Sequence, residues 1–236
     1  MKLLSWCAVL SAAALCLSLA GPAQAADPRN LAPGFSVLPA DAKLAVFPVD
    51  VELLSMSAGG VLEGRADWTA DARKHMMEAV ASKVAQSKLS LLNVSDDTAD
   101  EFAEQVGLHA AVANSVALHH GVGGVWALPS KNGQLLWSFG DAMQPVAAKA
   151  GASHGLFLFV RDSYASAERK VAMVALALLG VGLTGGAQIG YASLVDLQTG
   201  QVLWFNRLAR GSGDLREAAS AEESMAALLD GLPLPQ

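Results

Sequence analysis

Residues 187–208 hold the pattern that most constrains the fold of this chain. Two apolar runs rich in β-branched and aromatic side chains flank the five residues Asp196-Leu-Gln-Thr-Gly200. Gly200 can adopt the positive φ that a short hairpin loop requires. The segment therefore predicts an antiparallel β-hairpin whose structural turn residues are Asp196, Thr199 and Gly200.

The first 25 residues have the composition of a secretory signal peptide. Lys2 gives a positive start, residues 3–19 are almost wholly apolar, and Ala23-Gln24-Ala25 matches the small-x-small cleavage pattern. The alternative is a transmembrane anchor, but the apolar run is shorter than the roughly 20 residues of a spanning helix, and Gly21-Pro22 interrupts it. We predict that residues 1–25 are cleaved and that the mature protein is periplasmic in a Gram-negative bacterium, with association with the outer membrane left open.

Both cysteines, Cys7 and Cys16, fall in the predicted signal peptide, so the mature chain is expected to form no disulfide and no thiolate metal site. A lipidated cysteine needs a small residue before it, whereas Trp6 and Leu15 stand there, which favours a soluble protein over a lipid-anchored one. The formal net charge of −6 and the absence of a long basic run argue against nucleic acid as a partner.

The rest of the chain alternates between helical and strand patterns. The predicted elements are an extended arm or exposed lead-in over 26–42, strands over 43–53, 89–94 and 155–161, a small-residue loop over 55–64, helices that begin at Thr69 and at Thr98, a short helix over 143–150, the hairpin, and a final helix capped by Ser220 and ended by Gly231. Pro48 predicts a strand end or a bulge within the first strand. The expected fold class is α/β (α+β): a single domain over residues 43–232, with a mixed β-sheet packed with helices, ending in an antiparallel hairpin and a C-terminal helix.

Two short motifs add a family resemblance to this order of elements. Gly151-Ala-Ser153-His154-Gly-Leu156 occupies the place of a "Gly-Ala-Asp-Tyr-small-apolar" strand start, and 195–200 matches a "Val-Asp-x-x-Thr-Gly" hairpin. The chain thereby resembles the curli-secretion (CsgG-like) lipoproteins, the penicillin-binding-protein activator lipoproteins and the amino-terminal domain of TolB. The resemblance implies an α/β domain of the cell envelope that works by protein contact. Ser153-His154 replaces the Asp-Tyr pair of the motif.

Two further motifs match enzyme signatures in letters but not in context. Residues 151–155 spell G-x-S-x-G around Ser153, but a nucleophile elbow needs a strand before the serine and a helix after it, and here the predicted order is reversed. Residues 180–185 spell G-x-G-x-x-G, but no helix follows to meet a dinucleotide. We interpret both as places of close packing or turning.

The histidines give no metal-ligand spacing, and nothing in the sequence predicts a cofactor. His119 and His120 end a predicted helix, where their charge would complement the helix dipole. A metal site at this pair is kept as an alternative, because imidazoles are common ligands.

One apolar insertion, residues 165–187, is longer than a connection between neighbouring strands requires. Its residues 171–183 carry no charge, and as a helix they would rise about 20 Å, short of the roughly 30 Å hydrocarbon core of a bilayer. Three alternatives follow: a wholly buried helix, a subunit contact, or a shallow membrane-facing element. We expect one face to pack on its own domain and the other to form contacts, with Leu176, Leu178, Gly180, Gly182 and Gly185 as the candidate interaction residues.

The sequence thus favours a non-enzymatic periplasmic protein that acts by protein–protein contact in cell-envelope assembly or maintenance. Its expected partners are envelope proteins, with self-association or peripheral membrane contact through residues 171–187 as further options. The alternative is a small-molecule or metal-binding protein, or a hydrolase, that uses His119 and His120 or Ser153 and His154.

Overall fold

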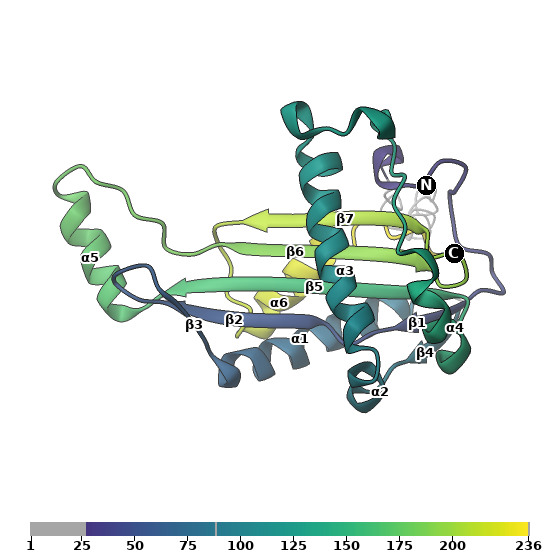
Figure 1. Cartoon of the computed structure of the whole chain (residues 1–236). Helices are drawn as coiled ribbons and strands as arrows, with labels where there is room; N and C mark the ends of the chain where they lie inside the picture. The colour runs from purple at the N-terminus through teal and green to yellow at the C-terminus, as the bar shows by residue number, and fades with distance from the viewer. Residues whose placement is uncertain (1–26, 88, 236) are drawn as a thin grey trace, which may run out of the picture.

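The structure, a computed structural model, describes residues 27–87 and 89–235, and the predicted signal peptide lies outside them. Its centre is a seven-stranded mixed sheet with helices on both faces (Figure 1). The chain ends in an antiparallel hairpin followed by a C-terminal helix. The predicted fold class is confirmed.

The strands are β1 (Lys43–Val46), β2 (Asp50–Met56), β3 (Leu62–Gly64), β4 (Ser90–Asn93), β5 (His154–Ala165), β6 (Gln188–Asp196) and β7 (Val202–Arg210). The helices are α1 (Ala66–Val84), α2 (Asp96–Asp100), α3 (Ala103–Val116), α4 (Gln144–Ala150), α5 (Ala167–Ala177) and α6 (Ala218–Leu228). In Figure 1, α3 and α4 cover the near face of the sheet, and α1 and α6 lie behind it.

The long strand β5 organises the sheet. One of its edges pairs with β6 along residues 154–162. The other edge pairs in parallel with two short strands in succession, first β1 at Leu44 and then β2 from Asp50 onward. The predicted single strand over 43–53 is therefore two strands, and the break falls at Pro48, which cannot donate a ladder hydrogen bond.

Alternating side chains of β5 separate two cores. Leu156, Leu158 and Val160 pack with the buried residues of α1 and α6. Phe157 and Phe159 point to the other face, where they meet the buried residues of α3 and α4. Because successive strand side chains point to opposite faces, one apolar strand serves both layers.

The helix predicted to begin at Thr69 begins earlier, at Ala66. The Thr69 hydroxyl does not cap the helix but accepts a hydrogen bond of 3.0 Å from the Leu53 N–H, which ties α1 to β2. The preceding segment, predicted as a loop over 55–64, contains the end of β2 and all of β3, which pair as a hairpin. The predicted buried stripe of α1 is confirmed at Ala72, Met76, Val80 and Val84.

The second predicted helix is in fact two helices, α2 and α3. Ser95, rather than Thr98, caps α2 and accepts a hydrogen bond from the Thr98 N–H. Phe102 then leaves helical geometry and is buried, with its ring edge against Phe47. Burial of this ring turns the chain between the two helices. The last helix likewise begins before its predicted cap Ser220, at Ala218.

The segment preceding β1 is not an exposed lead-in. Ala32 and Leu38 are buried, and the Ala32 N–H donates to the Leu203 carbonyl at 2.8 Å. Leu38 donates to Pro233 near the other end of the chain. The arm therefore covers part of the β7 edge, whose backbone groups need partners.

Candidate functional site

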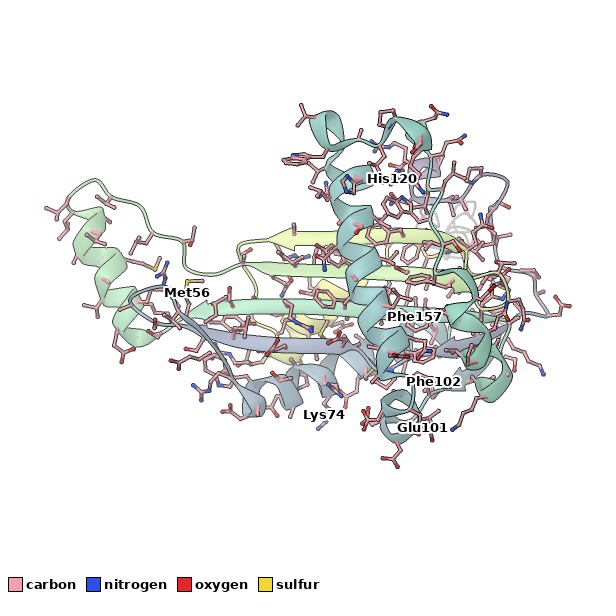
Figure 2. All side chains as sticks on the ribbon, in the orientation of Figure 1. Met56, Lys74, Glu101, Phe102, His120 and Phe157 are labelled. Atoms are coloured by element: carbon pink, nitrogen blue, oxygen red, sulfur yellow. The ribbon has the colours of Figure 1, made fainter. Side chains whose placement is uncertain are left out.

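The insertion leaves the sheet between β5 and β6 and projects beyond its end, at the left of Figure 1. It consists of α5 and a return segment over 178–187, which has no regular secondary structure from Val181 onward. Ser166 caps α5 by accepting a hydrogen bond from the Arg169 N–H, and its own N–H donates to Met56 at 2.9 Å. Figure 2 labels Met56 beside the root of the insertion.

The apolar side chains of the insertion are largely in solvent. Leu178 is 84% exposed and Leu179 is 76% exposed, and Val171, Val174 and Val181 are exposed as well. Leu176 is half-buried. The wholly buried helix is therefore wrong, because α1, α6, α3 and α4 already cover both faces of the sheet and leave no core for α5.

The glycines shape the return of the chain. α5 is followed by a turn in which Gly180 has φ +77°. The Val181 N–H donates a hydrogen bond to the Leu176 carbonyl and so caps the C-terminal end of the helix. The Gly185 carbonyl accepts from Ala165, whereas Gly182 has open space around it. The element after residues 180–185 is the strand β6 rather than a helix, so the G-x-G-x-x-G letters lack the context of a dinucleotide site.

Arg169 holds the insertion in place and was missed by sequence reasoning. Its side chain is buried, and its Nε donates to the Thr184 carbonyl at 3.0 Å. Its Nη1 donates to the carbonyls of Ser57 and Ala58, in the turn between β2 and β3. A cation in the first turn of a helix opposes the helix dipole, and this unfavourable position is the signal that could have revealed it.

A buried polar cluster lies at the root of the insertion, where β5 ends and β6 begins. The Asp162 Oδ2 accepts from the Tyr164 hydroxyl at 2.6 Å and from the Gln188 Nε2 at 2.8 Å. Ser224 on α6 donates to Gln188, and the Leu215 N–H donates to Tyr164. Burial raises the pKa of the Asp162 carboxyl and also that of the Tyr164 hydroxyl. These bonds fasten the end of β5 and the start of β6 to the C-terminal helix.

A second group of exposed apolar side chains lies at the far end of α3, which we call the α3 tip (residues 117–137). Val125 is 94% exposed, and Val122 and Trp126 are more than half exposed. His120, labelled there in Figure 2, bonds the Arg29 carbonyl at 2.7 Å, and His119 bonds the Trp126 carbonyl at 2.7 Å. The two imidazoles thus fix the backbone of the α3 tip through hydrogen bonds to the carbonyls of Trp126 and Arg29.

The alternative catalytic and metal residues do not form one site. Ser153 accepts a hydrogen bond from the Lys43 N–H at 3.1 Å and lies 3.2 Å from the Lys43 carbonyl, so its hydroxyl secures the start of β1. His154 hydrogen-bonds the hydroxyl of its neighbour Ser153 at 2.9 Å, and among the described residues neither side chain hydrogen-bonds His119 or His120. No cluster of three or more candidate metal ligands occurs in residues 27–87 and 89–235.

Asp196 ends β6, and Thr199 and Gly200 lie in the turn between β6 and β7. The Asp196 Oδ1 accepts from the N–H groups of Gln198 and Thr199, at 2.8 and 3.1 Å. Gly200 has φ +70°, and its carbonyl accepts from Phe139. These residues are structural: they hold the turn and the segment that precedes α4.

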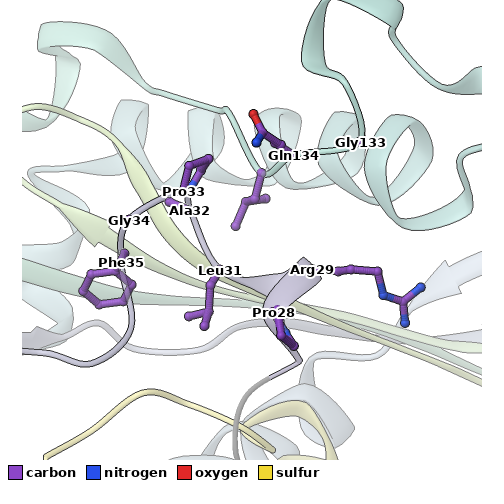
Figure 3. A pocket seen from close by; sticks show the side chains of 10 residues that line it. Pro28, Arg29, Leu31, Ala32, Pro33, Gly34, Phe35, Gly133 and Gln134 are labelled. Atoms are coloured by element: carbon purple, nitrogen blue, oxygen red, sulfur yellow. The ribbon is translucent and has the colours of Figure 1, made fainter.

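A surface cavity of about 370 Å³ lies between the N-terminal arm and residues 133–135 (Figure 3). Arg29 is the charged side chain in its lining, and it is paired with Asp27 at 2.7 Å and mostly exposed. The other lining groups are mainly proline, glycine and apolar side chains. No set of polar groups converges there on a ligand.

No protein-family model and no curated protein matches the sequence. Among solved structures, the chain is similar to the PelC dodecamer from Paraburkholderia phytofirmans, with 13% identity over 86% of this chain and 94% of that one and a TM-score of 0.39. It is also similar to the LpoB C-terminal domain from Salmonella enterica (16% identity, 76% and 87% coverage, TM-score 0.30) and to Lipoprotein GNA1162 from Neisseria meningitidis (15%, 72% and 79%, 0.30). The similar structures thus include a bacterial lipoprotein, the class that the two sequence motifs resemble. The finer resemblance to curli-secretion proteins and TolB stays a prediction, and likenesses of this degree identify neither family nor function.

Within the described residues, no helix has both the length and the apolar content that crossing a bilayer requires.

Proposed function

We propose that this protein is a non-enzymatic component of the bacterial cell envelope that binds other envelope proteins through its insertion, residues 165–187. The single observation that carries the proposal is the exposure of α5 and its return segment, which have no charged residue from Val171 to Ala187. From Val171 to Ala177, α5 is apolar all round, and such a helical segment is stable only when something covers it. A contiguous exposed apolar surface of this kind is typical of a contact site.

The insertion is also fixed in orientation. Arg169 binds the return segment and the β2–β3 turn, while Asp162 and Gln188 fasten its root. A surface held in place before binding loses less conformational entropy when a partner docks. The anchoring therefore suits recognition of a defined protein surface.

The backbone of the return segment favours a protein partner over the lipid interior. No hydrogen bond is found for the N–H groups of Gly182, Leu183 and Thr184 among the described residues. In hydrocarbon each unsatisfied group costs several kcal/mol, so irregular backbone does not face lipid chains. Water or the backbone of a partner protein can satisfy these groups.

The test compares complexes in envelope extracts of the producing bacterium by native electrophoresis. We expect the wild-type protein to migrate in a complex larger than the monomer, and Leu178→Glu to abolish that complex. Val37→Glu is the matched control, since Val37 is an exposed valine (48%) outside the insertion. Retention of the complex by Leu178→Glu would contradict the proposed function.

A further inference from the structure

The molecule exposes two separate apolar surfaces, and the proposed function uses only one of them. We propose that the α3 tip is the docking surface for the insertion of a second copy of this chain, so that copies associate head to tail. This inference rests on the proposed function and names one partner for the insertion.

The two surfaces have matching chemistry. The insertion presents Leu178 and Leu179, and the α3 tip presents Val122, Val125 and Trp126. Charged residues are depleted at the centres of protein interfaces, while aromatic residues such as tryptophan are enriched. Both surfaces are uncharged at their centres, and the α3 tip adds the aromatic side chain of Trp126.

The charges beside the two surfaces are complementary. Glu168 in the first turn of α5 and Glu63 on the adjacent hairpin form no ion pair among the described residues. Of the nearby cations, Arg169 is buried and binds backbone carbonyls, whereas Lys170 is exposed and, like the two glutamates, forms no ion pair among the described residues. The groups without an ion-pair partner that border the insertion are therefore two acidic side chains and one basic side chain, which leaves a net negative charge there.

The α3 tip carries the opposite sign. Residues 117–137 contain no acidic residue. Lys131 donates to the Leu136 carbonyl and lies over the Trp137 ring, and it forms no ion pair among the described residues. Arg207, whose side chain lies against Gly121, also has no carboxylate partner there. Opposite charges at the rims steer two surfaces together and fix their register.

The positions of the surfaces favour a head-to-tail contact over a two-fold one. In Figure 1 the insertion extends from one end of the sheet, whereas the α3 tip projects past the β7 edge at the top of the view, so the two do not meet within one molecule. A two-fold contact between two insertions would leave both tips in water. A head-to-tail contact covers one insertion and one tip together.

The experiment measures the mass of the purified full chain by light scattering. We expect the wild-type protein and Val37→Glu to self-associate, and Leu178→Glu and Val125→Glu each to be monomeric. Each of these two variants keeps the surface that the other has lost. Their equimolar mixture should therefore form a heterodimer and nothing larger.

Every other result decides against the inference. A mixture that stays monomeric, or self-association by Val125→Glu alone, would show that the tip does not receive the insertion. A wild-type protein that is monomeric at all concentrations, together with an envelope complex that Leu178→Glu abolishes, would refute the head-to-tail contact and leave the proposed function standing. Circular dichroism of each variant checks that it is folded.

Discussion

At the scale of single residues, Gly200 shows two constraints acting at one position. Its φ of +70° lies in the left-handed region, which side chains disfavour. In addition, a Cβ built on Gly200 would overlap the backbone of Gly140, including its carbonyl oxygen. Gly34 has a similar φ of +79° but no atom within 4 Å of such a Cβ.

We predict that Gly200→Val lowers the free energy of unfolding by more than Gly34→Val does. Strain at φ alone should cost about 1–3 kcal/mol in both variants, and the overlap with Gly140 should add to it only at Gly200. Urea unfolding of the two variants measures the difference. Equal losses would mean that the turn moves away from Gly140 without cost.

His109 is the buried titratable group of α3. Its Nε2 bonds the Ser193 hydroxyl at 2.9 Å, its ring stacks on Phe157, and burial lowers its pKa to about 3. In the unfolded chain the pKa is about 6.5. The unfolded state therefore binds an extra proton between these two values, and this contribution to stability is complete above pH ~6.5 and lost as the pH falls.

We predict that the free energy of unfolding falls more steeply with acidification in the wild-type protein than in His109→Gln. The difference in slope should be roughly 1.4 kcal/mol per pH unit between the two pKa values. Glutamine keeps a polar partner for Ser193 but does not titrate. Parallel profiles of wild type and variant would show that His109 is not a neutral, buried group.

At the scale of elements, the sequence predicts best where local pattern and tertiary packing agree. The β6–β7 hairpin follows from its two apolar runs and Gly200, and the α1 stripe follows from the spacing of Ala72, Met76 and Val80. Local pattern misplaces the caps at Thr69 and Thr98. Contacts with distant segments set these ends: Thr69 bonds β2, and Phe102 packs on Phe47.

The candidate site is predictable only in part. The uncharged composition of the insertion is visible in the sequence, but its exposure depends on which faces of the sheet other helices cover. The α3 tip has no periodic pattern, and its exposed residues are brought together by carbonyl bonds from His119 and His120. Such bonds join positions as distant as Arg29 and His120, which no local pattern specifies.

For the insertion, we predict that Arg169 holds it in place on the sheet. Arg169→Ala removes the hydrogen bonds to Thr184, Ser57 and Ala58 and should release the insertion without unfolding the sheet. We expect chymotrypsin to cleave residues 178–183 several-fold faster, with an unchanged thermal midpoint. Lys170→Ala, at an exposed neighbouring position, is the control. Equal cleavage rates in the two variants would show that Arg169 does not hold the insertion.

At the scale of the whole molecule, the described residues form one sheet with two cores, and both cores are built partly by β5. The arm lies across the edge of this sheet, and the insertion extends from one end of it. The chain therefore combines a well-covered body with two exposed apolar surfaces, the insertion and the α3 tip.

The prediction at this scale concerns export. We expect the purified protein to begin at Ala26 and to be released with the periplasmic fraction, as the sequence of residues 1–25 indicates. N-terminal sequencing and fractionation measure both properties. Lipid attached to Cys16, or a full-length chain embedded in the membrane, would contradict this expectation.

The tandem pairing of β1 and β2 along β5 has a consequence for the order in which the chain can fold. Both early strands share a neighbour that is synthesised about a hundred residues later, since β5 begins at His154. Pairing between such distant segments is slow because a long loop must close first. Until β5 emerges, the first half of the chain has no central strand on which to assemble. The topology thus delays folding during synthesis, and a chain that is still unfolded is suited to the export that residues 1–25 predict.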